Sequence, residues 1–130
     1  MQKEIAFIET VMKSFSPAML ETETVTRWLV GQVHPGGPVC PVCGESVTGE
    51  AGLRNFYALK RVQCKKCNNH SNAAAGTVLH GLKFDIRFVF LMALLIGAGM
   101  SYQKIGEILK LQPRTVQIWS EKFAQIGQKG

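Results

Sequence analysis

Four cysteines form two Cys-x-x-Cys pairs, Cys40 with Cys43 and Cys64 with Cys67, and twenty residues separate the pairs. Each pair can fold into a tight knuckle that offers two thiolates to one ion, and tetrahedral zinc takes four such ligands. The chain has no further cysteine, so no thiol is left over. The spacing therefore predicts one structural zinc ion held by all four side chains.

Disulfides or a thioredoxin-like redox site are less consistent with these cysteines. The chain opens with Met1-Gln2-Lys3-Glu4 and runs into a charged stretch, where a secretory signal would have an apolar core. We therefore expect a cytoplasmic, reducing compartment, in which thiols stay available to metal. Catalytic zinc is also disfavoured, because four thiolates leave no open position for water. His70 could replace a cysteine as ligand, but with four thiolates present it is expected to be a loop or strand residue.

Positive charge begins with the cysteine segment and continues to the end of the chain. The net charge is +6, from 15 Lys and Arg against 9 Asp and Glu. Residues 1–39 carry three basic against four acidic side chains, residues 40–80 five against two, and residues 81–130 seven against three. This distribution favours a nucleic-acid partner, although the same charge can simply keep a small protein soluble. The expected phosphate contacts are Arg54, Lys60, Arg61, Lys65 and Lys66.

The most apolar stretch, residues 88–100, resembles a membrane span in composition but is too short for one. As a helix it would rise only about 20 Å, against roughly 30 Å for a bilayer core. Arg87 and Lys104 also bracket it. A helix that is apolar on every side is a buried one, so we predict the central helix of a small helical core and no membrane partner.

The segment after this stretch has the pattern of two short helices joined by a turn. Ser101 can cap the first helix, and Gly106 allows a neighbouring helix to approach closely. Residues 110–112 form the turn, and Pro113 fits the first position of the second helix. The positions expected to face inward are Ile105, Ile108, Leu109, Val116, Trp119 and Phe123. This plan is that of a helix-turn-helix DNA reader, although a helical hairpin of this size can also be a plain packing unit.

If the hairpin reads DNA, the outward positions of its second helix face the major groove. These are Arg114, Thr115, Gln117, Ile118, Glu121 and Lys122. Gln117 best matches adenine, Arg114 guanine or a phosphate, and Ile118 a thymine methyl. Ser101, Tyr102 and Lys104 are placed to touch the DNA backbone. Glu121 matches cytosine. For both Glu121 and Lys122, a role as a solvated surface charge is at least as good an explanation as a DNA contact.

These segments together resemble a known family. The pattern Cys-Pro-Val-Cys-Gly (40–44), Cys-Lys-Lys-Cys (64–67), Gly-Thr-Val-Leu-His (76–80) and Lys-Phe-x-x-Arg-Phe (83–88) is similar to the N-terminal DNA-binding part of bacterial insertion-sequence transposases. It also resembles the short zinc-ribbon repressors of some insertion elements. The resemblance covers roughly residues 38–125 and implies a zinc ribbon with the four cysteines as ligands and a recognition helix beginning near Pro113. The chain stops where a transposase would begin its catalytic domain, and residues 1–37 depart from the pattern.

The N-terminal third and the segment between the cysteine pairs complete the expected architecture. Residues 2–15 form an amphipathic helix in this prediction, and Ser16-Pro17 ends it and starts another. The apolar positions expected to make contacts are Ile5, Ile8, Val11, Met12, Phe15, Met19, Leu20, Val25, Trp28 and Leu29. They can pack on the helix at 88–100, or residues 2–29 can pair with a second copy of the chain as a homodimer. Residues 36–38 form a hinge, and the alternating residues 56–63 predict a strand.

The sequence offers no set of residues suited to catalysis. Asp85 is the one aspartate, and no carboxylate cluster, Gly-rich phosphate loop or free nucleophilic cysteine is present. We therefore expect a non-enzyme that is mainly α with a small zinc-ribbon β element. Its predicted parts are an N-terminal helical segment (1–37), a four-cysteine zinc ribbon (38–80) and a helix-turn-helix unit (81–130). The predicted function is a sequence-specific, double-stranded-DNA-binding transcriptional regulator of bacterial or mobile-element origin. The alternatives are an adaptor for a protein such as RNA polymerase or a transposase and, less favoured, an RNA-binding ribbon.

Overall fold

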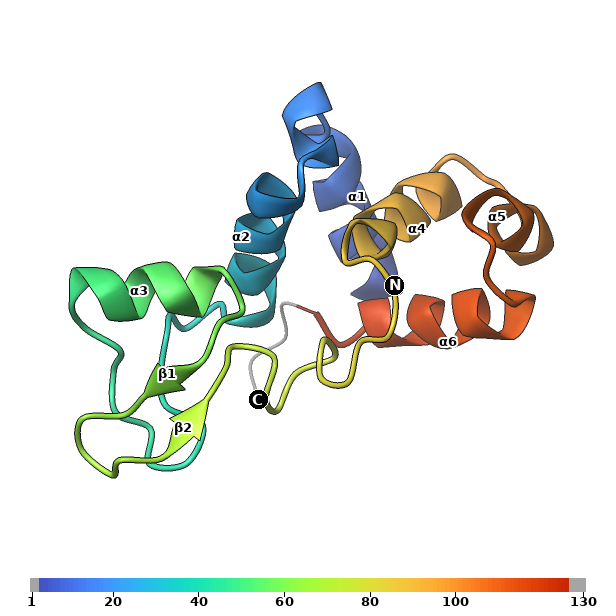
Figure 1. Ribbon diagram of the computed structural model, residues 1–130. Helices are drawn as coiled ribbons and strands as arrows, with labels where there is room; N and C mark the ends of the chain where they lie inside the picture. Colours follow the sequence, from blue (N-terminus) through green and yellow to red (C-terminus); the bar gives the residue numbers. More distant parts are fainter. Residues whose placement is uncertain (1–2, 127–130) are drawn as a thin grey trace.

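The computed structural model describes residues 3–126, with side chains from Ala6 onward. The chain is mainly helical, as predicted, with one small antiparallel sheet. The elements in chain order are α1 (Lys3–Ser14), the 3-10 helix η1 (Pro17–Leu20), α2 (Thr22–Val33), α3 (Glu50–Tyr57), β1 (Val62–Gln63), β2 (His70–Ser71), α4 (Arg87–Gly97), α5 (Tyr102–Leu109) and α6 (Pro113–Phe123). Figure 1 shows α3 and the strands on one side of α2, and α1, α4, α5 and α6 on the other.

Helix α4 is the centre of the main core, as its composition predicts. Val89, Phe90 and Met92 are fully buried, and α1, α2, α5 and α6 all pack against this helix. The Trp28 ring meets Phe90 edge-on, with centroids 5.3 Å apart. The helix ends at Gly97, three residues earlier than predicted, because Gly99 takes a left-handed conformation (φ +89°) and turns the chain toward α5. Among the described residues, no helix has both the length and the apolar character needed to cross a bilayer.

Helix α1 packs on α4 and α6 through a face that overlaps the predicted one but is shifted toward Phe7 and Val11. Phe7, Ile8 and Val11 are buried, whereas Met12 and Phe15 are 45% and 42% exposed. Because α1 contacts two helices at once, its buried face is centred between them rather than on one row. Packing on α4 fits the first of the two predicted alternatives. Residue 2 and the side chain of Ile5 lie outside the described part of the chain.

The second N-terminal helix begins later than Ser16-Pro17. Pro17–Leu20 form a single 3-10 turn, and the α-helical geometry starts at Thr22. Met19 and Leu29 are buried as predicted, but Leu20 is 47% exposed.

The segment between the cysteine pairs contains a helix, and the predicted strand over residues 56–63 is wrong for most of its length. Helix α3 ends at Tyr57, and only Val62–Gln63 are extended, paired antiparallel with His70–Ser71. Leu53 and Phe56 are three residues apart, so a helix turns both toward the same side. Phe56 is then buried in a small second core, which stabilises the helix over a strand.

Helix α2 belongs to both cores. Its Val25 and Leu29 lie in the main core, while Val30 packs with Phe56 and Ala73 in the second. At the end of α2, the His34 ring donates from Nε2 to the Ala73 carbonyl at 2.6 Å. We call residues 38–73 the cysteine module. The packing of Val30 and the His34 hydrogen bond are direct contacts between this module and α2, so they set its position relative to the other helices.

The hairpin of α5 and α6 has the predicted turn and caps. The Ser101 hydroxyl accepts the Lys104 N–H at 3.2 Å, Lys110 is left-handed (φ 60°), and Pro113 opens α6. The inward positions Ile105, Leu109, Val116, Trp119 and Phe123 are all buried. Ile108 is the exception. It is 49% exposed, whereas Ile105 and Leu109 on the same helix are buried.

Gly106 permits a close approach, as predicted, but to the turn after α5 rather than to a neighbouring helix. A Cβ at this position would lie 2.5 Å from the Leu111 carbonyl oxygen. We expect Gly106→Ala to lower the free energy of unfolding by about 1–3 kcal/mol, because the rigid backbone of the turn must move. Gly31→Ala in α2 is the control. No atom lies within 4 Å of the added carbon, so it should stabilise by up to about 1 kcal/mol. Denaturant melts that gave the same sign for both variants would contradict this packing.

Candidate metal centre and nucleic-acid surface

The two cysteine pairs form knuckles with matching backbone geometry. In the first, the Gly44 N–H donates to the Cys40 carbonyl at 2.9 Å; in the second, the Asn68 N–H donates to the Cys64 carbonyl at 2.9 Å. Gly44 and Asn68 both follow the second cysteine of a pair, and both are left-handed, with φ of 80° and 64°. Glycine and asparagine are the residues that tolerate this conformation best. The sequence thus carries the turn signal of both knuckles.

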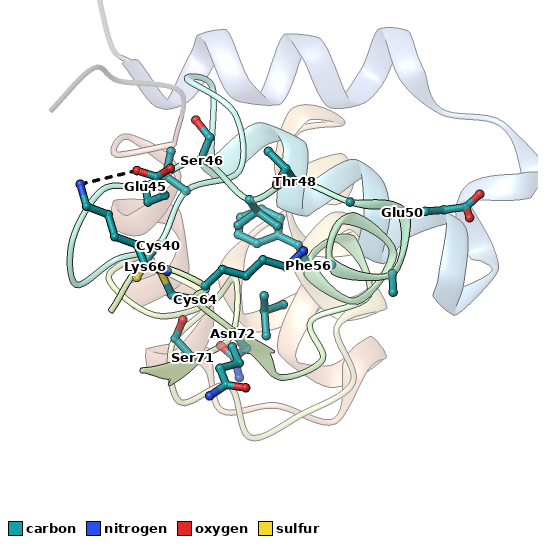
Figure 2. Close-up of a pocket in the computed structure, with 18 residues that line it drawn as sticks. Cys40, Glu45, Ser46, Thr48, Glu50, Phe56, Cys64, Lys66, Ser71 and Asn72 are labelled. Atoms are coloured by element: carbon teal, nitrogen blue, oxygen red, sulfur yellow. Dashed lines mark hydrogen bonds and ion pairs between the residues drawn. The ribbon is translucent and has the colours of Figure 1, made fainter. Parts of the chain in front are cut away.

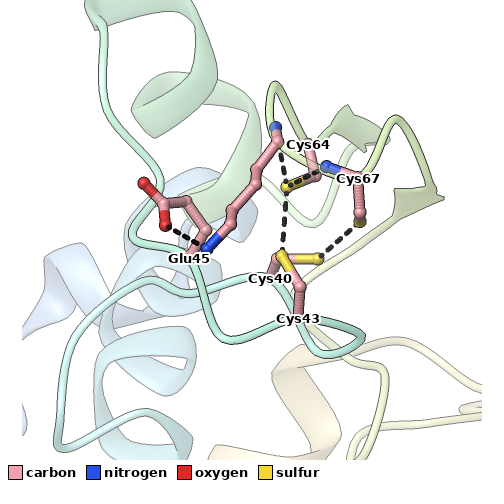
Figure 3. A network of polar contacts seen from close by, with 6 residues as sticks. Cys40, Cys43, Glu45, Cys64 and Cys67 are labelled. Carbon is pink, nitrogen blue, oxygen red and sulfur yellow. Dashed lines mark hydrogen bonds and ion pairs between the residues drawn. The ribbon is translucent and has the colours of Figure 1, made fainter.

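The four sulfur atoms converge on one point. They lie within 4.8 Å of one another, and two contacts join the knuckles: 3.7 Å between Cys40 and Cys67 and 3.5 Å between Cys43 and Cys64 (Figure 3). Tetrahedral zinc with Zn–S bonds near 2.3 Å places its sulfurs about 3.8 Å apart. The donor set therefore fits a metal ion of that size, as the cysteine spacing predicts. No other such group of His, Cys, Asp or Glu occurs among the described residues.

Backbone and side-chain N–H groups surround the sulfurs. The Val42 N–H donates to Cys40 Sγ and the Lys66 N–H to Cys64 Sγ, both at 3.4 Å. The Asn69 amide nitrogen donates to Cys67 Sγ at 3.3 Å. Such bonds favour the thiolate, which is the form that binds metal. The sequence did not indicate a role for Asn69. It lies two residues after Cys67, the same offset at which Glu45 follows Cys43.

These donors lower the pKa of the thiols in the second knuckle. The pKa of Cys67 is lowered to about 6, first by the Asn69 side chain and then by the Asn69 backbone N–H. The pKa of Cys64 is also lowered, chiefly by the backbone N–H groups of Cys67 and Lys66. The second knuckle is therefore the more readily ionised half of the site.

The first knuckle contains a thiol that ionises less readily. A backbone bond at Glu45 lowers the pKa of Cys43, but desolvation and the contacts with Cys64, Cys67 and Cys40 outweigh it and raise the pKa to about 12. Four thiolates this close repel one another unless a cation lies between them. A divalent ion would supply that charge and would make all four side chains ligands.

The outward face of α6 carries most of the side chains predicted to read DNA. Arg114, Gln117, Ile118 and Glu121 follow the helical spacing of one face and are all exposed. The buried face of the same helix holds Val116, Trp119, Ser120 and Phe123. Thr115 is half-buried at the edge, in a shallow groove beside Gly106 and Lys110.

Three other predicted contacts have partners within the protein. The Tyr102 hydroxyl donates to Ser120 Oγ at 3.0 Å, which ties α5 to α6. The Lys122 ammonium lies over the Trp119 ring, 4.4 Å from its centre. Lys104 pairs with Glu107 at 3.9 Å on the surface of α5. The sequence did not indicate that Ser120 is a buried polar residue, because nothing local distinguishes it from a surface serine.

The five basic residues predicted to contact phosphate are all exposed on the cysteine module: Arg54, Lys60, Arg61, Lys65 and Lys66. Lys66 forms an ion pair with Glu45 at 3.8 Å, which links the two knuckles (Figure 2). The other four have no ion-pair partner among residues 3–126. The module therefore presents free positive charge.

Asp85, the one aspartate, has a structural partner. Its carboxylate accepts the Arg87 N–H at 2.9 Å at the start of α4, and the Arg87 guanidinium lies against it. These hydrogen bonds from Arg87 lower the pKa of Asp85. The carboxylate is thus engaged in holding the first turn of α4.

Comparisons of the chain with protein-family models, curated proteins and solved structures found no match.

Proposed function

We propose that this chain is a sequence-specific DNA-binding transcriptional regulator, without enzymatic activity, in which α5 and α6 act as a helix-turn-helix. The observation that carries the proposal is the division of α6 into two faces. One face consists of the buried side chains Val116, Trp119 and Phe123. The other face is exposed and carries Arg114 and Gln117. A recognition helix needs both faces, because one must hold it on the core while the other enters the major groove.

The side chains on this exposed face suit base reading. Gln117 can form two hydrogen bonds with the edge of adenine, and Arg114 can form two with guanine. Ile118 can contact a thymine methyl group. The Tyr102–Ser120 bond holds α6 against α5 and so fixes the direction of this face. Lys122 is left out of the reading set, because its ammonium covers Trp119.

The proposed metal is a single structural zinc ion. The four cysteine sulfurs fill a tetrahedral shell, so zinc would hold the two knuckles together and leave no position for substrate. The knuckles would in turn hold the basic residues of the module, which we assign to phosphate contacts. The resemblance to the DNA-binding part of insertion-sequence transposases accords with both assignments.

The phosphate-contact role of the module can be tested by the salt dependence of binding to a duplex of arbitrary sequence. We expect log K to fall steeply with log[salt], and Arg61→Ala to make the slope shallower by about one unit on any sequence. Fluorescence anisotropy at several salt concentrations measures both quantities. Val42→Ala, an exposed apolar position of the same module, is the matched control and should leave the slope unchanged. Weak binding that does not vary with salt would argue for the adaptor instead.

A further inference from the structure

A cavity of about 520 Å³ lies in the cysteine module, between its two hairpins and α3. Figure 2 shows Cys40, Ser46, Phe56, Cys64 and Ser71 around it. The first hairpin (residues 38–47) and the second (residues 62–71) meet at the cysteines, but no backbone hydrogen bond joins them elsewhere in the described chain. Their separation leaves this space open.

Strand β1 has an unpaired backbone edge at Gln63. In the β1–β2 ladder, Val62 faces Ser71 and Gln63 faces His70. The Cys64 N–H donates to the Asn69 carbonyl, so residues 63 and 70 are the pair that does not exchange hydrogen bonds. The Gln63 N–H and C=O therefore point away from β2, and neither has a backbone partner among the described residues. Gln63 also lines the cavity.

The first hairpin has the same kind of open pair. Val39 and Ser46 face each other, with hydrogen bonds from the Cys40 N–H to Glu45 and from the Val47 N–H to Pro38 on either side. The peptide groups of Val39 and Ser46 thus point outward from the hairpin. Both residues line the cavity. Unpaired strand edges of this kind readily accept another strand.

The remaining walls define what side chains a strand here would carry. Val47, Phe56 and Val62 form an apolar wall. Two acidic and two basic residues also line the cavity: Glu45, Glu50, Lys65 and Lys66. Glu45 and Lys66 pair with each other, and Figure 2 shows the Glu50 carboxylate directed away from the other labelled residues.

Lys65 is the remaining charge. Its ammonium nitrogen lies beside Gly49, 3.8 Å from the position that a Cβ atom would take at this glycine. It has no ion-pair partner in the described chain. A carboxylate on the occupant would complement it.

We propose that this cavity binds an extended peptide segment of a protein partner, which adds a strand to the free edge of β1. The peptide would exchange backbone hydrogen bonds with Gln63, place an apolar side chain against Phe56, and pair a nearby carboxylate with Lys65. Backbone pairing supplies affinity in this mode of recognition, and the side-chain pockets supply specificity. This site is separate from the exposed face of α6, so the inference does not depend on base reading, and Lys65 and Lys66 are the residues that it shares with the set assigned to phosphate contacts.

The test is a selection of random linear decapeptides displayed on phage against the zinc-loaded full chain. We expect enrichment of peptides that carry an acidic residue close to an apolar one. A fluorescent synthetic copy of the enriched peptide should bind Gln63→Pro at least about tenfold more weakly, because proline removes the outward N–H yet is tolerated on a free edge. Gln63→Ala keeps that N–H and should bind within about twofold of the wild type.

Zinc content and far-UV circular dichroism verify that each variant is folded. Lys65→Glu should weaken binding of the acidic peptide and favour a version with its acidic residue changed to lysine. The proposal is overturned if no peptide is enriched, if Gln63→Pro and Gln63→Ala bind alike, or if a single-stranded oligonucleotide displaces the peptide from the cavity at equal concentration. Duplex binding by Gln63→Pro, measured in parallel, should match the wild type and separates this result from the proposed DNA function.

Discussion

Removal of the metal by a chelator is expected to unfold the cysteine module while the main helical core stays folded. The second core buries only Val30, Phe56 and Ala73 fully, which is too little to hold a unit of this size without a metal. Structural zinc sites of this type supply on the order of 10 kcal/mol of folding free energy. The main core has its own large buried cluster around Phe90 and Phe123, with no cysteine in it.

Hydrogen exchange with and without zinc measures this difference by segment. We expect the amides of α3, β1 and β2 to lose protection, whereas those of α4 and α6 keep it. Cys64→Ser should reproduce the effect without a chelator, and Val42→Ala, between the cysteines of the first knuckle, should not. Loss of protection throughout the chain would contradict the separation of the two cores. Retention everywhere would contradict a structural metal.

Replacement of Gln117 by alanine is expected to change which DNA sequences are bound rather than only how tightly. The side chain lies in the middle of the exposed face of α6, between Arg114 and Glu121. Loss of a bidentate contact to adenine should reduce discrimination at one base pair by about 1–3 kcal/mol, roughly 5- to 150-fold. Competition among duplexes that differ at single positions measures the change.

Lys122→Ala is the matched control on the same helix. Its ammonium covers Trp119, so its removal should leave the sequence preference as it is. A phosphate-contact variant such as Arg61→Ala should weaken all duplexes alike. If Gln117→Ala shifted no position, or if Lys122→Ala shifted one, the assignment of the reading face would be wrong.

Local signals in the sequence were sufficient for the elements that depend on them. The cysteine spacing predicted the convergence of the four sulfurs, and Ser101 predicted the start of α5. Pro113 and the apolar repeat of α6 predicted the start and the buried face of that helix. The composition of residues 88–100 predicted a central helix, because a helix apolar on all sides must be surrounded. For the helices, the residues that carry the signal are close in sequence, and for the cysteines each knuckle is a local motif even though the two pairs lie twenty residues apart.

The errors arose where distant contacts decide the outcome. Residues 56–63 alternate like a strand, but burial of Phe56 against Val30 favours a helix up to Tyr57. Met12 and Ile108 fit inward positions, yet they are 45% and 49% exposed, and Met12 covers only the end of α4 at Gly97. The Tyr102–Ser120 bond was also unpredictable, since neither residue signals the other across eighteen positions.

The central claim is that the zinc-loaded chain reads DNA sequence through α6. Selection of bound duplexes from a random pool at physiological salt tests it most directly. We predict an enriched motif, and a two-fold symmetric motif would also indicate that two copies bind together. The absence of any enriched motif, with zinc bound in a one-to-one ratio, would contradict the claim and favour a protein-binding adaptor.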